Sequence, residues 1–254
     1  MQVRNEIASG HLERFIKQNL PLLDCLVVYD DASDDGTAER IEPYCDVLIR
    51  GTMPLFGDEL RSRQQLLDAS AHLTSDHDFY LWLDADEVLY ASKDELIGIC
   101  QKLHAENFDG ARLPHVNLWR SNFFYRTDDY YDDLYPVRLW RAGANLSFPL
   151  KSGLHNEMHP LGMNSIARLT KPSVVHYGFA SDQLLEDKFA LYQSYGQRGR
   201  NLYRLVSEEG RTLKPLNDRA DFLGARFDTA FGKNATEPDL RNQISWLLGA
   251  AKSS

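Results

Sequence analysis

Apolar runs alternate with helical patterns over roughly the first ninety residues of the chain. Residues 79–83 are an unbroken apolar and aromatic run without 3.6-residue spacing, which predicts a strand buried on both faces. Residues 25–29 and 47–49 predict two earlier strands, and residues 1–6 leave room for only two or three strand residues. The spacing of apolar positions predicts intervening helices over residues 11–20, 38–44 and 56–71.

This alternation predicts an α/β fold with right-handed parallel crossovers, which is a doubly wound, mostly parallel sheet with helices on both faces. Ligands of such sheets bind outside the carboxyl ends of the strands. Asp30 and Asp31 follow one predicted strand, and Asp84 and Asp86 follow another. We therefore expect two acidic clusters to face one crevice.

The Asp84–Ala–Asp86 segment has the chemistry of a cation site. If the strand continues through it, both carboxylates lie on the same side of an extended backbone. Two oxygen ligands with open positions left over suit Mg²⁺ or Mn²⁺ shared with the phosphates of a substrate. The alternative is an acidic corner after a strand that is simply solvated.

Composition narrows the function classes. The 254-residue chain has a net charge of −9, which argues against a sequence-independent grip on nucleic acid and against a polybasic membrane anchor. The three cysteines, Cys25, Cys45 and Cys100, have spacings of neither a disulfide framework nor a zinc cluster. We expect each to be a small buried residue in a reducing, cytoplasmic compartment. No apolar run has the length of a membrane span, and no signal-peptide pattern opens the chain.

The second half of the chain has weaker signals. Residues 111–119 and 137–140 predict strands, and a loop rich in Phe and Tyr between them has the aromatic faces that suit stacking on sugars. From residue 181 the pattern is helical, with Leu184, Leu185, Phe189 and Tyr192 on one stripe and a basic character overall. The expected division is a domain over residues 1–180, with halves 1–107 and 108–180, and a helical extension over 181–254 that packs on it.

Four segments together resemble the nucleotide-binding half of a family 2 glycosyltransferase with the GT-A fold. They are RNE at 4–6, VVYDDASDDGT at 27–37, FGDELRSRQQLL at 56–67 and LWLDADEVL at 81–89. Weaker resemblance continues through YPVRLW at 135–140, LHNE at 154–157 and VHYGF at 175–179. Members of that family usually have several more strand residues before the RNE position.

The resemblance implies roles for individual residues at the donor site. One of Asp30 and Asp31 would hydrogen-bond the base or the ribose, and Arg63 would reach the base or the diphosphate. Asp84 would contact the ribose or a metal-bound water. The metal, Mn²⁺ or Mg²⁺, would be bound by Asp86 and His176. The nucleotide pocket would be lined, largely through backbone, by Val3, Arg4, Asn5 and Glu6.

The resemblance also implies a reaction. A metal-dependent, inverting hexosyltransferase would move a sugar from a UDP-linked donor to a hydroxyl of a glycan, lipid-linked or protein acceptor. For the general base we favour Glu157, with His155 as the neighbour that positions it or replaces it. Asp132 and Asp133 are the next candidates. Peripheral membrane contact and oligomerisation stay open.

Rival functions are weaker. A catalytically inactive nucleotide-sugar-binding protein on the same fold is the main alternative, whereas a nucleotidyltransferase would need a glycine-rich phosphate loop that the chain lacks. The acidic loop after residue 29 matches parts of an EF-hand pattern but follows a strand former instead of a helix. In HNEMH, residues 155–159, the glutamate is misplaced for a zinc protease, and flanking Gly153 and Pro160 leave no room for its helix.

Overall fold

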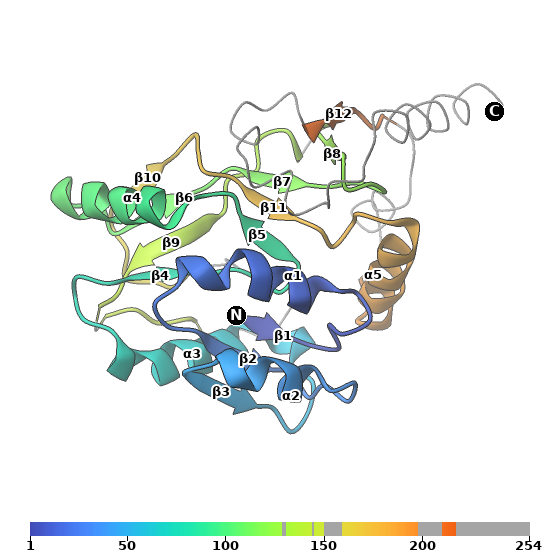
Figure 1. The fold of residues 1–254 in the computed structure, drawn as a ribbon, viewed down its shortest axis with the longest axis horizontal. Coiled ribbons are helices and arrows are strands. Elements are labelled where there is room, and N and C mark those ends of the chain that lie inside the picture. The colour runs from blue at the N-terminus through green and yellow to red at the C-terminus, as the bar shows by residue number, and fades with distance from the viewer. Residues whose placement is uncertain (129–130, 144, 150–158, 198–209, 217–254) are drawn as a thin grey trace. The chain divides into compact units, whose positions relative to one another are not determined.

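Three parallel strands form the first sheet of a mixed α/β fold (Figure 1). The computed structural model describes residues 1–128, 131–143, 145–149, 159–197 and 210–216, all of which belong to the compact unit Met1–Asp218. The sheet has the order β1-β2-β3, with strands β1 (Gln2–Val3), β2 (Val27–Asp30) and β3 (Val47–Arg50). The connecting helices are α1 (His11–Gln18), α2 (Thr37–Ile41) and α3 (Glu59–Ser70).

The second sheet is mixed and has the order β10-β6-β9-β4. Its strands are β4 (Phe79–Leu81), β6 (Gly110–Arg112), β9 (Val137–Arg141) and β10 (Ile166–Arg168). Strands β4 and β6 both run antiparallel to β9, while β10 runs parallel to β6. Parallel pairing is thus confirmed for the first three strands, but one continuous doubly wound sheet is not, because no strand pairing joins β4 to β1 within the described residues.

Strands β2 and β4 belong to different sheets, and residues of both line one apolar cavity. Its volume is about 630 Å³, and residues of both strands line it, together with Met1 and side chains of α3 and helix α4 (Lys93–Ala105). Strand β1 is two residues long, so it pairs with only the last part of β2, at Tyr29 and Asp30. Strand β4 is correspondingly half-buried, which corrects the expectation of a strand buried on both faces.

The third sheet brings Glu87, Asn117 and His176 side by side. It has the order β5-β11-β7, with strands β5 (Glu87–Leu89), β7 (His115–Asn117) and β11 (Val174–His176). In its register His176 lies opposite Glu87 on one side and Asn117 on the other. The remaining elements are the antiparallel pair β8 (Phe124–Arg126) and β12 (Leu213–Pro215), and helix α5 (Asp182–Ser194).

Helix α4 was not expected from the apolar pattern. Its signal is at its start, where the Ser92 hydroxyl accepts a hydrogen bond from the Glu95 N–H at 3.1 Å. None of the helices in the described residues is long and apolar enough to cross a membrane.

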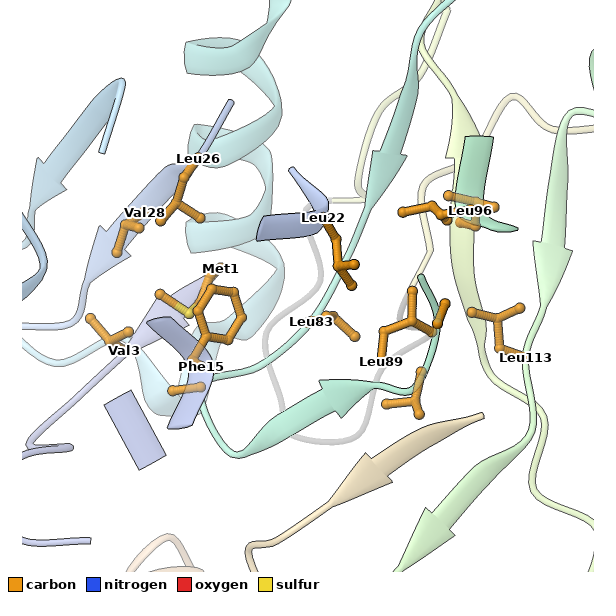
Figure 2. Close-up of a cluster of buried hydrophobic side chains, with 14 of the residues drawn as sticks. Met1, Val3, Phe15, Leu22, Leu26, Val28, Leu83, Leu89, Leu96 and Leu113 are labelled. Atoms are coloured by element: carbon orange, nitrogen blue, oxygen red, sulfur yellow. The ribbon is translucent and has the colours of Figure 1, made fainter. Parts of the chain in front are cut away.

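Buried apolar side chains connect the first and third sheets. Figure 2 shows Met1, which precedes β1, and Phe15 from α1 beside one another, with Leu83 and Leu89 in the same cluster. Leu83 and Leu89 lie on either side of the acidic segment that follows β4, and both are at most 2% exposed. The core therefore holds both ends of that segment in place.

The side chain of Asn19, just after α1, forms two hydrogen bonds with the backbone of β5, at the edge that faces away from β11. Its side-chain N–H₂ donates to the Glu87 carbonyl at 2.8 Å, and its side-chain oxygen accepts from the Leu89 N–H at 3.0 Å. The other edge of β5 pairs with β11. Because Asn19 is fully buried, no water can replace these two hydrogen bonds.

Asn19→Ala is therefore expected to reduce the free energy of unfolding by about 2–4 kcal/mol, since it leaves a buried N–H and a buried C=O without partners. Urea unfolding followed by circular dichroism measures this loss. The exposed Gln101→Ala on α4 is the control and should change the value by less than about 0.5 kcal/mol. Equal effects of the two variants would contradict the role assigned to Asn19.

The cysteines differ from the expectation of three buried thiols. Cys25 is exposed, and Cys45 and Cys100 are only partly buried; none forms a disulfide. Burial raises the pKa of the Cys45 thiol and of the Cys100 thiol to about 11. At pH 8 only about one in a thousand of these two thiols is then ionised, and the thiolate is the reactive form.

A thiol-reactive chromophore at pH 8 should consequently label Cys25 first. We expect Cys45 and Cys100 to react at least about tenfold more slowly, because both access and ionisation are limited. Cys25→Ser should remove the fast phase from the absorbance trace. Three equal rates, or a fast phase that survives in Cys25→Ser, would show that the exposure and pKa differences have no such effect.

Candidate functional site

The acidic segment after β4 is a turn, not an extended strand. The Glu87 N–H donates to the Asp84 carbonyl at 3.0 Å, and the intervening Ala85 and Asp86 form the turn. The expectation that alternation places Asp84 and Asp86 on one side of a strand is therefore wrong. The two carboxylates have different partners: Asp84 lies 3.7 Å from Arg138, whereas Asp86 meets His176 and Lys188.

Asp86 and His176 are brought together from ninety residues apart in the sequence. The Asp86 Oδ2 atom lies 3.0 Å from His176 Nε2. The backbone fixes this approach, because the Tyr177 N–H donates to the Asp86 carbonyl at 2.7 Å. Their side chains are only 12% and 10% exposed, so the contact is largely screened from water.

A hydrogen-bonded relay determines which nitrogen of His176 carries the proton. Arg138 and His115 both bind Oε1 of the Glu87 carboxylate, His115 through Nε2 at 2.8 Å. The other His115 nitrogen, Nδ1, accepts from the Asn117 N–H₂ at 3.2 Å, which directs the Asn117 oxygen to His176 Nδ1 at 2.8 Å. An amide oxygen can only accept, so the proton of His176 is on Nδ1 and the Nε2 lone pair faces Asp86.

Two acceptors therefore converge with no proton between them. Burial lowers the pKa of His176 to about 4 against the opposing pull of Asp86, so the imidazole is neutral near pH 7. Two lone pairs 3.0 Å apart repel unless a cation contacts both atoms. In the structure the Lys188 ammonium from α5 supplies that cation, 2.7 Å from Asp86 Oδ2 and 3.1 Å from His176 Nε2.

Asp84, Asp86 and Glu87 differ in how strongly nearby cations stabilise their negative charges. Burial alone would raise the pKa of Glu87, but Arg138 and His115 outweigh it and lower the pKa to about 2. Burial of Asp86 is likewise outweighed, here by the Lys188 ammonium, which holds the pKa of Asp86 well below the usual value. Partial burial and the nearby Glu87 raise the pKa of Asp84, although Arg138 and Arg63 oppose that rise.

The second acidic cluster lies at the carboxyl end of β2. Asp30 and Asp31 are 3% and 1% exposed, and each has a buried carboxylate oxygen without a hydrogen-bond partner in the described part of the chain. Burial raises the pKa of Asp31, while the Leu55 N–H and the Arg4 guanidinium, 3.9 Å away, oppose the shift. Unpaired buried acceptors at the end of a parallel strand are available for donors of a ligand.

The other residues expected near the nucleotide mostly shape the adjoining loop. Val3 is buried in β1 and accepts a hydrogen bond from the Asp31 N–H through its carbonyl at 2.9 Å. Asn5, with φ 53°, exchanges hydrogen bonds with Asp34 at 2.9 and 3.0 Å, and the Glu6 N–H donates to Thr37 Oγ1 at 2.8 Å. These contacts fix the acidic loop beside β1.

Arg63 is the expected basic residue between the clusters. It is buried on α3, with its guanidinium 3.4 Å from Glu59 and 5.8 Å from the Trp82 ring. Its positive charge, with that of Arg138, opposes the rise in the pKa of Asp84 that burial and Glu87 cause. No hydrogen bond or ion pair joins Asp30 or Asp31 to Asp86 in the structure over the described ranges.

Comparison with known proteins gives only distant likeness. No family model and no curated protein matches the chain. Among solved structures, TarS of S. aureus is similar at 14% sequence identity and a TM-score of 0.48; the likeness covers 82% of this chain and 41% of TarS. TarS 1–349, also solved in complex with UDP, gives 14% identity and a TM-score of 0.47 over 82% of this chain and 68% of that one. Likeness at this level establishes neither a family nor an activity for the present chain.

The general-base candidates are mostly not tested. Glu157 and His155 lie outside the described residues. Asp132 and Asp133 are both exposed, and Asp133 forms an ion pair with Arg168 on the surface.

Sequence reasoning missed three side chains of the site: His115, Asn117 and Lys188. His115 and Asn117 alternate about Val116 in a short strand, which places both on one face. Lys188 lies three residues after Leu185 and four before Tyr192, inside the apolar stripe of α5. A lysine in an apolar stripe is a signal that could have identified it.

Asn117→Leu is expected to let the ring proton of His176 occupy either nitrogen, because the amide oxygen that accepts from Nδ1–H is lost. The ¹⁵N chemical shifts of the His176 ring report the tautomer. They should indicate one protonated nitrogen, Nδ1, in the parent protein and a mixture in the variant. The ring of exposed His72 is the internal control and should not change. An unchanged His176 tautomer in Asn117→Leu would contradict the relay.

Proposed function

We propose that the chain is a metal-dependent, inverting glycosyltransferase of GT-A type, which moves a sugar from a nucleotide-activated donor to an acceptor hydroxyl. The observation that carries this proposal is the convergence of Asp86 Oδ2 and His176 Nε2, 3.0 Å apart, at the turn that follows β4. Inversion, the UDP-linked donor and the identity of the acceptors are carried over from the motif resemblance alone.

The two acceptors suit a divalent ion. A carboxylate oxygen and a neutral imidazole nitrogen are donors that Mn²⁺ accepts, and Asp86 and His176 would hold it. No group of three or more His, Cys, Asp or Glu side chains in the described residues could hold a metal. A metal at this place would consequently complete its coordination with water and with phosphate oxygens of the donor.

The charge distribution supports a nucleotide diphosphate as the ligand. When bound, a divalent ion neutralises the negative charge that develops on the diphosphate as the anomeric C–O bond breaks. Asp84, whose side chain is 35% exposed, is free to accept from the ribose. The unpaired buried oxygens of Asp30 and Asp31 would accept from the base or the ribose, and Arg63 would add positive charge beside Asp84.

The acceptor hydroxyl must lose its proton as it attacks the anomeric carbon. Glu157, with His155 beside it in sequence, is proposed to accept that proton. The relay from Glu87 to His176 has a different role, because it keeps the Nε2 lone pair directed to the metal position. A protein that binds the nucleotide sugar on the same fold without turnover is the alternative, and turnover decides between the two.

Asp86→Ala is expected to reduce transfer or hydrolysis of the donor by at least about 10²–10³-fold, since it removes one of two ligands for the ion. Activity is followed as release of UDP from a panel of UDP-sugars with Mn²⁺. EDTA should abolish the same activity in the parent protein. The control is Asp94→Ala, which removes an exposed carboxylate on α4 and should leave activity unchanged.

Activity that persists with EDTA present, or in Asp86→Ala, would contradict the metal-dependent mechanism. Thermal unfolding with UDP and Mn²⁺ gives an independent readout, because a ligand at 100 times its Kd adds about 2.7 kcal/mol to stability. Stabilisation by UDP with Mn²⁺ but no turnover of any donor would favour the inactive binding protein.

A further inference from the structure

Lys188 occupies the position that the proposed metal would take. Its Nζ atom lies 2.7 Å from Asp86 Oδ2 and 3.1 Å from His176 Nε2, the two atoms whose lone pairs converge. It comes from α5, beyond the motifs that carry the resemblance, and its side chain is 25% exposed. The ammonium is thus a cation that contacts both acceptors.

The backbone at Gly178 closes one side of the cluster formed by Asp86, His176 and Lys188. Gly178 borders the same point: a Cβ at that residue would overlap Lys188 Nζ, Asp86 Oδ2 and His176 Nε2 at once. An ion held by Asp86 and His176 would have to approach two atoms that the Lys188 ammonium already contacts. Two cations that contact the same Asp86 oxygen repel one another, so the ammonium and a metal ion would compete for it.

We propose that Lys188 is an internal competitor for the metal, which neutralises Asp86 until metal and donor diphosphate arrive together, and then contacts the diphosphate. This inference rests on the proposed function. The Lys188 side chain is a flexible four-carbon stem and is 25% exposed to solvent. The ammonium can therefore leave Asp86 without movement of α5.

The anion of the donor supplies the reason for the ammonium to move. Once a divalent ion lies between Asp86 and His176, Lys188 loses its carboxylate partner, and a diphosphate bound to the same ion offers the nearest compensating charge. The Phe179 ring, 5.0 Å from Nζ, lines this side of the site and limits where the ammonium can go. Binding of metal alone is thereby weakened, and binding of metal with diphosphate is favoured.

Mn²⁺ binding to the full chain, measured by electron paramagnetic resonance of the free ion, tests the proposal. Lys188→Met should bind Mn²⁺ alone at least about tenfold more tightly than the parent protein, because the competing charge is gone. Saturating UDP should tighten Mn²⁺ binding by a larger factor in the parent than in Lys188→Met. Lys93→Met, which removes an exposed lysine paired with Asp24, is the charge-matched control and should change neither value.

Lys188→Gln, which keeps a polar group of similar reach, provides a second variant if Lys188→Met does not fold. Unchanged or weaker Mn²⁺ binding in the neutral variants, with binding in the parent still abolished by Asp86→Asn, would overturn the role of Lys188 and leave the metal site intact. Binding that Asp86→Asn does not affect, or no Mn²⁺ binding in any variant, would overturn the metal site and the inference together.

Discussion

The buried hydrogen-bonded relay from Glu87 through His115 and Asn117 to His176 is the constraint on which the site depends. His115 donates to Glu87, Asn117 donates to His115, and His176 donates to Asn117. The proton of His176 is therefore on Nδ1, and the direction of its Nε2 lone pair is fixed by the protein alone. The register of the third sheet makes this chain continuous, because His176 is flanked by Glu87 and Asn117. A slip of one residue would turn these side chains to the other face.

The position of the relay depends in turn on α1. Asn19 pairs with the edge of β5 that no strand covers, and Phe15 packs into the same core as Leu83 and Leu89. The acidic turn is held at both ends by these contacts. Side chains of the first and second sheets pack together in the same apolar clusters, and residues of β2 and β4 also line an apolar cavity. The parallel strand β2 leads to Asp30 and Asp31, whereas Asp86 and His176 belong to the turn after β4 and to β11.

Local patterns predicted α1, α3 and the strands β2 and β3 to within a few residues, because each has a strong period and lies next to turn residues. They failed at Asp84–Glu87, where a turn replaces the expected extended chain, since β4 pairs antiparallel with β9 and ends at Leu81. The proximity of Asp86 to His176 could be anticipated only through motif resemblance. The relay could not, because its four members come from three strands whose register no local pattern encodes.

The negative charges of Asp84, Asp86 and Glu87 are compensated by nearby cations to different degrees. Glu87 is paired with a buried arginine and a histidine, and such a pair is costly to break, so its role is structural. Asp86 is paired with a lysine on a flexible, partly exposed stem. Asp84 lies at a longer distance from its arginine, and burial and Glu87 raise its pKa although Arg138 and Arg63 oppose that rise. Three carboxylates of one short acidic segment thus differ in their pairing partners: a buried arginine and a histidine for Glu87, a partly exposed lysine for Asp86, and a more distant arginine for Asp84.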